Sequence, residues 1–141
     1  AVVWMESRID QALERHHMGY NCAQSVACTY CDLFGFDEET AFKMTEGFGL
    51  GMGSMQATCG ALSGAMAVAG MLNSKGLGQY VSKKDTYALG RRMTGEFTDA
   101  VGSIVCREIK GVDTGVILKS CDGCVEEGCR LVEKLLEEKG L

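Results

Sequence analysis

Cysteine is the residue type in this sequence with the greatest capacity for chemistry. The chain has eight cysteines among 141 residues. A deprotonated cysteine is the nucleophile of thiol–disulfide exchange and also a ligand for soft metal ions. A chain of this length can bury a core without covalent cross-links, so structural disulfides are not needed. In that setting cysteines more often bind metal or carry out redox reactions.

Three of these cysteines are expected in the first turn of a helix. They are Cys22, Cys59 and Cys121. A helix N-terminus favours negative charge, and a thiolate is the form of cysteine that reacts and binds metal. A single buried cysteine would ordinarily be a packing residue. Three such placements exceed what core packing alone predicts.

The element expected at the centre of the fold is a helix over residues 56–72. This stretch has no charge and no proline, and alanine, glycine and methionine are frequent in it. At about 100° per residue, Cys59, Ser63, Ala67 and Gly70 share one side of the helix. Because these residues are small, we expect other backbones to approach that side closely.

Apolar periodicity predicts further helices on both sides of this central one. They are expected over residues 5–18, 22–34, 37–46, 84–110 and 121–139. The glycine-rich residues 47–53 are expected to form a compact loop leading into the central helix. No stretch alternates as a strand would. The sequence therefore predicts a single all-α domain over residues 1–141, a bundle of about six helices, with residues 1–4 as a disordered extension.

The expected helices also predict where the cysteines point. In the helix over residues 22–34, Cys22 shares the apolar side, whereas Cys28 and Cys31 fall among polar residues and are expected to face outward. Cys106 lies away from the aliphatic side of its helix, in line with two glycines and an aspartate. Cys106 is therefore expected to contact something other than the core.

Four cysteine motifs follow one another in a distinctive order. They are Gly19-Tyr-Asn-Cys-Ala-Gln-Ser-Val26, Cys59-Gly-Ala-Leu-Ser-Gly64, Val101-Gly-Ser-Ile-Val-Cys-Arg-Glu-Ile-Lys-Gly-Val-Asp113, and Cys121 ahead of the last helix. Over residues 5–139 this order resembles the bacterial and archaeal family of redox-active proteins defined by four cysteines and a CGAxxG motif. That family is also similar to a domain of the split-Soret cytochromes, which suggests association with electron-transfer cofactors.

The resemblance implies which cysteines are functional. Its four cysteines correspond to Cys22, Cys59, Cys106 and Cys121, with Cys124, one helical turn further on, as the substitute for Cys121. The remaining three cysteines have no counterpart and are interpreted as incidental.

Three functions would use these thiols. The first is electron transfer through an iron–sulfur cluster, for which four thiolates are the standard ligand set. The second is thiol–disulfide exchange without metal, because Cys28-x-x-Cys31 and Cys121-x-x-Cys124 have the spacing of redox pairs. The third is a structural zinc site made from the same two pairs. The remaining interpretation is an all-α domain whose cysteines only pack, with no cofactor.

Composition argues against several other classes of protein. No Ser/His/Asp arrangement, paired carboxylate site or nucleotide-binding loop indicates a conventional enzyme active site. The two histidines, His16 and His17, are adjacent, cannot share a helix face, and are expected to be surface or packing residues. The net charge of −5, without a basic cluster, argues against nucleic-acid binding.

The same features suggest a location and partners. The uncharged stretch is too short for a convincing membrane span, and the first residues lack the features of a secretory signal, so we expect a cytoplasmic protein. A redox function would require a redox partner protein. The flat small-residue faces would also allow a homodimer.

Overall fold

The computed structural model describes residues 6–78 and 80–141, and over these residues the chain is helical without a strand. The longer helices are α1 (Ile9–Met18), α2 (Cys22–Tyr30), α3 (Glu38–Thr45), α5 (Gly60–Asn73), α6 (Lys83–Val101) and α8 (Cys121–Glu138). The short segments are α4 (Gly49–Met52), α7 (Cys106–Ile109) and the 3-10 turns η1 (Cys31–Phe34) and η2 (Glu46–Phe48). The predicted all-α fold is confirmed. Residues 1–4, expected as an extension, lie outside the described part of the chain.

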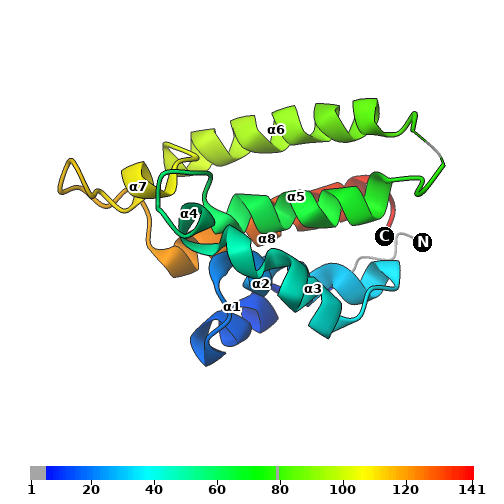
Figure 1. Ribbon diagram of the computed structural model, residues 1–141, viewed down its shortest axis with the longest axis horizontal. Helices are drawn as coiled ribbons and strands as arrows, with labels where there is room; N and C mark the ends of the chain where they lie inside the picture. The colour runs from blue at the N-terminus through cyan, green and yellow to red at the C-terminus, as the bar shows by residue number, and fades with distance from the viewer. Residues whose placement is uncertain (1–5, 79) are drawn as a thin grey trace.

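Helix α5 is the centre of the bundle, as expected for the small-residue helix (Figure 1). It packs against α2, α6 and α8, while α1 packs against α2 and α8. Helix α6 runs along one side of α5, and α1 to α3 lie on the other. The short segments α4 and α7 lie at the end of the bundle where α5 and α8 begin. No described helix is both long and apolar enough to cross a membrane.

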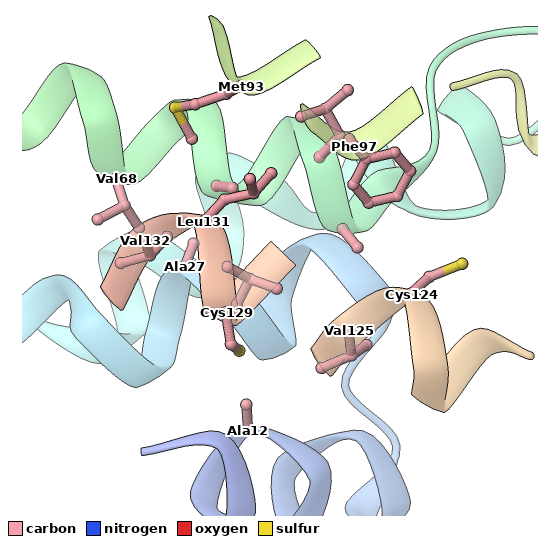
Figure 2. Packing of buried hydrophobic residues seen from close by; sticks show 14 of the residues in the cluster. Ala12, Ala27, Val68, Met93, Phe97, Cys124, Val125, Cys129, Leu131 and Val132 are labelled. Atoms are coloured by element: carbon pink, nitrogen blue, oxygen red, sulfur yellow. The ribbon is translucent and has the colours of Figure 1, made fainter. Parts of the chain in front are cut away.

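The core between these helices consists mostly of aliphatic and small side chains, together with Met93, Phe97 and Tyr30 (Figure 2). Helices can approach closely where glycine replaces a larger residue. A Cβ atom on Gly64 would lie 2.5 Å from the Ala23 carbonyl oxygen, and one on Gly128 would lie 2.8 Å from the Ala61 oxygen. Close packing of α5 therefore occurs on the side of Gly64. The side expected to be closely approached, that of Cys59, Ser63, Ala67 and Gly70, is approached by another backbone at Cys59, whose N–H donates to the Ile104 oxygen at 2.7 Å, but a Cβ on Gly70 would have nothing within 4 Å.

Helix starts follow the capping residues of the sequence. Asn21 forms a capping box with Gln24: each side chain accepts a hydrogen bond at 2.9 Å from the backbone N–H of the other residue. At the start of α3 the Asp37 side chain accepts a hydrogen bond from the Thr40 N–H. At the start of α8 the Ser120 side chain accepts one from the Gly123 N–H. These caps fix the first residues of three helices.

The predicted continuous helix over residues 84–110 is wrong. It ends at Val101, because Gly102 has the left-handed φ of 104° that terminates helices. The chain then forms an antiparallel bridge between Thr58 and Val105. The Cys59 N–H donates to the Ile104 oxygen at 2.7 Å, so the start of α5 is joined to the start of α7.

The expectation that Cys28 and Cys31 face outward is also wrong. Both are buried, in a small cluster with Ala41 and with the partly buried Phe42 and Met71. The reason is that α3 packs back over the side of α2 that a helical wheel assigns to solvent.

Candidate thiol centre

Five cysteines surround one cavity at the α4–α7 end of the bundle. The cavity has a volume of about 200 Å³, and its walls include Cys22, Cys59, Cys106, Cys121 and Cys124. The structure therefore brings together all four cysteines expected from the sequence and also the substitute, Cys124. All eight cysteines of the chain are unpaired thiols in the structure.

The positions of four thiols follow from where helices begin. Cys22, Cys106 and Cys121 are the first residues of α2, α7 and α8, and Cys59 is the N-cap of α5. The expected start of the central helix at residue 56 was therefore four residues early. Four helix starts meet around one cavity, and backbone N–H groups at helix starts are unpaired donors that stabilise negative charge.

The glycine-rich segment over residues 47–53 contributes one residue to the cavity wall. Leu50, at its tip, lines the cavity, and both Leu50 and Gly51 have left-handed φ angles. A Cβ on Gly51 would lie only 2.6 Å from the Cys106 Cβ, so a larger residue would not fit there. The sequence showed this loop only as a connection. The signal for its role was the alternation of glycines over residues 47–53, shortly before Cys59.

Two lysines also line the cavity, and neither was expected there from the sequence. The Lys110 ammonium donates a hydrogen bond to Cys121, with Nζ 3.1 Å from Sγ. This hydrogen bond raises the pKa of Lys110, and nearby Cys106 and Cys22 act in the same direction. The Nζ atom of Lys119 lies 3.6 Å from Oε1 of Glu127. A sequence signal existed, since the two lysines lie four residues after Cys106 and two before Cys121.

The cavity thiols differ in their ionisation. Burial raises the pKa of Cys22 to about 12 despite its place at a helix start. The pKa of Cys59 shifts in the opposite direction. A hydrogen bond from the Cys124 thiol lowers it to about 7, because this bond, the N–H groups of Ala61 and Leu62, and Lys110 together outweigh the effect of burial. The same hydrogen bond and burial raise the pKa of Cys124. The thiolate expected at helix starts is therefore favoured at Cys59 and disfavoured at Cys22.

The adjacent histidines join α1 to the start of α8. His16 Nδ1 lies 2.6 Å from Asp122 Oδ1, and His17 Nε2 lies 2.8 Å from Asp122 Oδ2. The hydrogen bonds from His17 and His16 lower the pKa of Asp122. His16 also lines the cavity. Both histidines therefore pair with the Asp122 carboxylate from the same helix, although adjacent residues were not expected to share a helix face.

The other three cysteines lie outside the cavity. Burial raises the pKa of both Cys28 and Cys129 to about 12, so neither is a reactive thiol at neutral pH. Figure 2 shows Cys129 pointing toward Ala12 of α1, whereas the Cys124 sulfur points away from that part of the core. The two Cys-x-x-Cys pairs are thus not brought together. Over residues 6–78 and 80–141, no three Cys, His, Asp or Glu side chains are arranged to hold a metal ion.

Comparison with protein families gives a match over most of the chain. The family described as "Putative redox-active protein (C_GCAxxG_C_C)" matches residues 20–135, a span that includes every cysteine. In this chain the motif is Cys59-Gly-Ala-Leu-Ser-Gly64, with cysteine and glycine in the opposite order to that in the family's designation. Comparison with curated proteins and with solved structures found no match in either set. Since the family match covers most of the chain and the cysteines of its motifs meet at one cavity, the protein belongs to the C_GCAxxG_C_C family of redox-active proteins.

Proposed function

We propose that the protein transfers electrons through an iron–sulfur cluster bound by Cys22, Cys59, Cys106 and Cys121. The observation that supports this proposal is that these thiols, from four separate segments, line one cavity. Four cysteine thiolates are the usual ligand set of such clusters. A compact ligand run is absent from the sequence; in the described part of the chain the four thiols line one cavity, although they are not arranged to hold a single metal ion.

The residues around the cavity suit such a group in charge and polarity. Thiolates are soft ligands of the kind that iron–sulfur clusters require. Lys110 and the helix starts place positive charge beside them, which offsets the negative charge of several thiolates. Ile109 and Leu50 form an apolar part of the cavity wall. When bound, the cluster would supply reversible one-electron oxidation and reduction.

Cys121 rather than Cys124 is assigned as the fourth ligand. Cys121 is half-buried, faces Lys110 and begins its helix as Cys22 and Cys106 do. Cys124 is one turn further along α8 and only 2% exposed, and its thiol helps to lower the pKa of Cys59. Cys124 thus supports a ligand without being one.

A second candidate function is thiol–disulfide chemistry without metal. The opposite pKa shifts of Cys59 and Cys124, which line the same cavity, favour it, because a low-pKa thiol near a protonated one is the usual arrangement of a reactive pair. This candidate does not use the Cys28-x-x-Cys31 pair. In either case we propose a cytoplasmic location, where thiols stay reduced, and a redox partner protein.

Anaerobic purification followed by visible absorption and by iron and sulfide analysis tests the cluster. We expect broad charge-transfer absorption with iron and sulfide in fixed ratio to protein. Cys59→Ser should abolish both, whereas the matched control Cys28→Ser, outside the cavity, should keep them. A colourless, iron-free protein after reconstitution would refute the cluster, and bound zinc alone would indicate a structural site.

A further inference from the structure

An apolar groove runs along the side of α5 that lies between α3 and α6. The groove consists of two adjoining pockets of about 260 and 360 Å³, which share Phe48 and Ala67. Ser63, Ala67 and Gly70 of α5 line it, and a Cβ atom on Gly70 would have nothing within 4 Å. Figure 1 shows α6 above α5 and α3 below it. The small residues of α5 therefore leave room for another helix to approach this side closely.

Large apolar side chains form the walls of this groove. They are four methionines and two phenylalanines: Phe36, Met44, Phe48, Met52, Met66 and Met71. Met44 is 64% exposed and Met52 is 55% exposed, so neither belongs to the core. Contiguous exposed apolar surface marks an interaction site, and the flexible methionine side chain adapts its shape to a bound helix. The groove therefore has the composition of a helix-binding surface.

The charges on the two sides of the groove are opposite. On the α3 side, residues 37–46 contain four acidic residues and one lysine, and on the α6 side, residues 83–92 contain four basic residues and one aspartate. All ten of these charged residues are exposed. Arg15 pairs with one of the acids and Glu138 with one of the arginines, and each side still keeps the sign of its net charge. The surface is therefore complementary in charge to a second copy of itself.

These two charged stretches lie beside the same half of α5. Met71, in the last turn of α5, lines the groove together with Met44 of α3. Asn73, at the end of α5, donates a side-chain hydrogen bond to the Thr86 hydroxyl of α6 at 2.8 Å. A two-fold axis parallel to α5, on the open side of the groove, would place the basic stretch of each copy against the acidic stretch of the other. A two-fold axis across α5 would instead move these stretches apart.

We propose that this groove is the interface of a two-fold homodimer, in which the α5 helices of two copies lie side by side. The second copy supplies both the helix that meets the small residues and the charges that pair across the groove. Because the axis is parallel to α5, both thiol cavities, at the start of α5, lie at the same end of the dimer. The dimer does not depend on what the thiol centre binds, since no cysteine lines the groove.

The experiment measures the full chain by sedimentation equilibrium over a range of concentrations, with reductant present so that no disulfide links two copies. We expect a mass that rises from 15.1 kDa toward twice this value, and a dissociation constant that increases with salt because exposed charges are screened. Met44→Ser and Ala67→Gln should each weaken the dimer about tenfold or more, since both alter the groove surface. Met18→Ser, at a similarly exposed methionine of α1 outside the groove, should leave the dimer unchanged.

Charge reversal tests the symmetry of the interface. Glu39→Lys with Glu46→Lys gives the α3 side a net positive charge, and Lys84→Glu with Arg91→Glu gives the α6 side a net negative charge. Each double variant should dimerise more weakly than the wild type. An equimolar mixture of the two should recover the affinity as a heterodimer, because the reversed sides then match at both contacts. Circular dichroism and urea midpoints check that every variant folds.

A chain that stays monomeric at every concentration would overturn the proposal and leave the groove to a different protein. A dimer that the two groove variants do not weaken would place the interface elsewhere on the molecule. Charge-reversed variants that do not recover affinity on mixing would exclude the axis parallel to α5. Each of these three results would overturn the proposed dimer.

Discussion

At the scale of single residues, the environment of each sulfur decides its chemistry more than its place on a helix does. Cys22 and Cys59 are both at helix starts, yet burial raises the pKa of Cys22 to about 12 and the Cys124 thiol lowers that of Cys59 to about 7. A hydrogen bond to the charged form can outweigh desolvation. Cys59 is therefore the thiol of the cavity expected to react first.

This difference predicts the pH dependence of alkylation in the reduced, metal-free protein. The pKa of Cys59 is lowered, so its thiolate is present above about pH 7 and is lost as the pH falls below it. The rate of Cys59 modification by iodoacetamide, followed by peptide mass spectrometry, should show a midpoint near pH 7. Cys22 should stay slow up to about pH 12. Cys124→Ala removes the donor and should move the Cys59 midpoint upward; an unchanged midpoint would contradict the role of Cys124.

Only part of the site could be predicted from the sequence. Cys22, Cys59, Cys106 and Cys121 followed from their motifs, and the structure places them together; their role as ligands stays a prediction. The hydrogen bond from Lys110 could not be predicted, because it depends on how the α7–α8 connection folds back toward the start of α8.

At the scale of elements, glycines set the distance between the helices that carry the thiols. At Gly64, α5 meets the backbone of Ala23 in α2, one residue after Cys22. An added methyl group there must push the two helices apart. Gly70 lies on the same helix, and a Cβ added to it would have nothing within 4 Å, so it offers a matched control.

Gly64→Ala should destabilise the protein by about 1–3 kcal/mol through overpacking. Gly70→Ala should stabilise it by up to about 1 kcal/mol, because alanine is the better helix former. Free energies of unfolding from urea titrations would measure both effects. Equal effects at the two positions would show that helix propensity, and not close backbone contact, controls this helix.

The sequence predicted helices well but their boundaries and exposed sides less well. Caps such as Asn21 and Asp37 are local signals, and the helices begin where these residues indicate. Gly102 is one glycine among 19, and only the bridge that follows it shows that it ends a helix. Likewise, a helical wheel could not show that α3 covers Cys28.

At the scale of the whole molecule, the proposed centre would add a link between helices that already meet through side-chain packing and close backbone contacts. Its four ligands come from the starts of α2, α5, α7 and α8. The all-α bundle itself could be predicted, because periodicity and the absence of strand alternation are properties of the entire chain. The homodimer stays a prediction; the tightest small-residue contacts, at Gly64 and Gly128, are made within the chain.

Metal loading should therefore stabilise the global fold. A ligand that binds only the folded state adds about 2.7 kcal/mol at a free concentration about one hundred times its dissociation constant. We expect the urea midpoint of iron-loaded protein to exceed that of metal-free protein, and the difference to vanish in Cys106→Ser. Cys129→Ser, a core position outside the cavity, should lower both midpoints equally. A loaded midpoint no higher than the metal-free one would contradict coupling between the centre and the fold.

The spread of these ligands along the chain also governs when the centre can be assembled. Cys121 is the first residue of the last helix, so no nascent chain that stops before α8 carries all four thiols. At synthesis rates of roughly 5–20 residues per second, the earlier thiols wait several seconds for the last one. Under the proposed function, the complete ligand set would therefore form only after Cys121 has been synthesised, and during that interval the earlier thiols are exposed to whatever oxidants surround the ribosome.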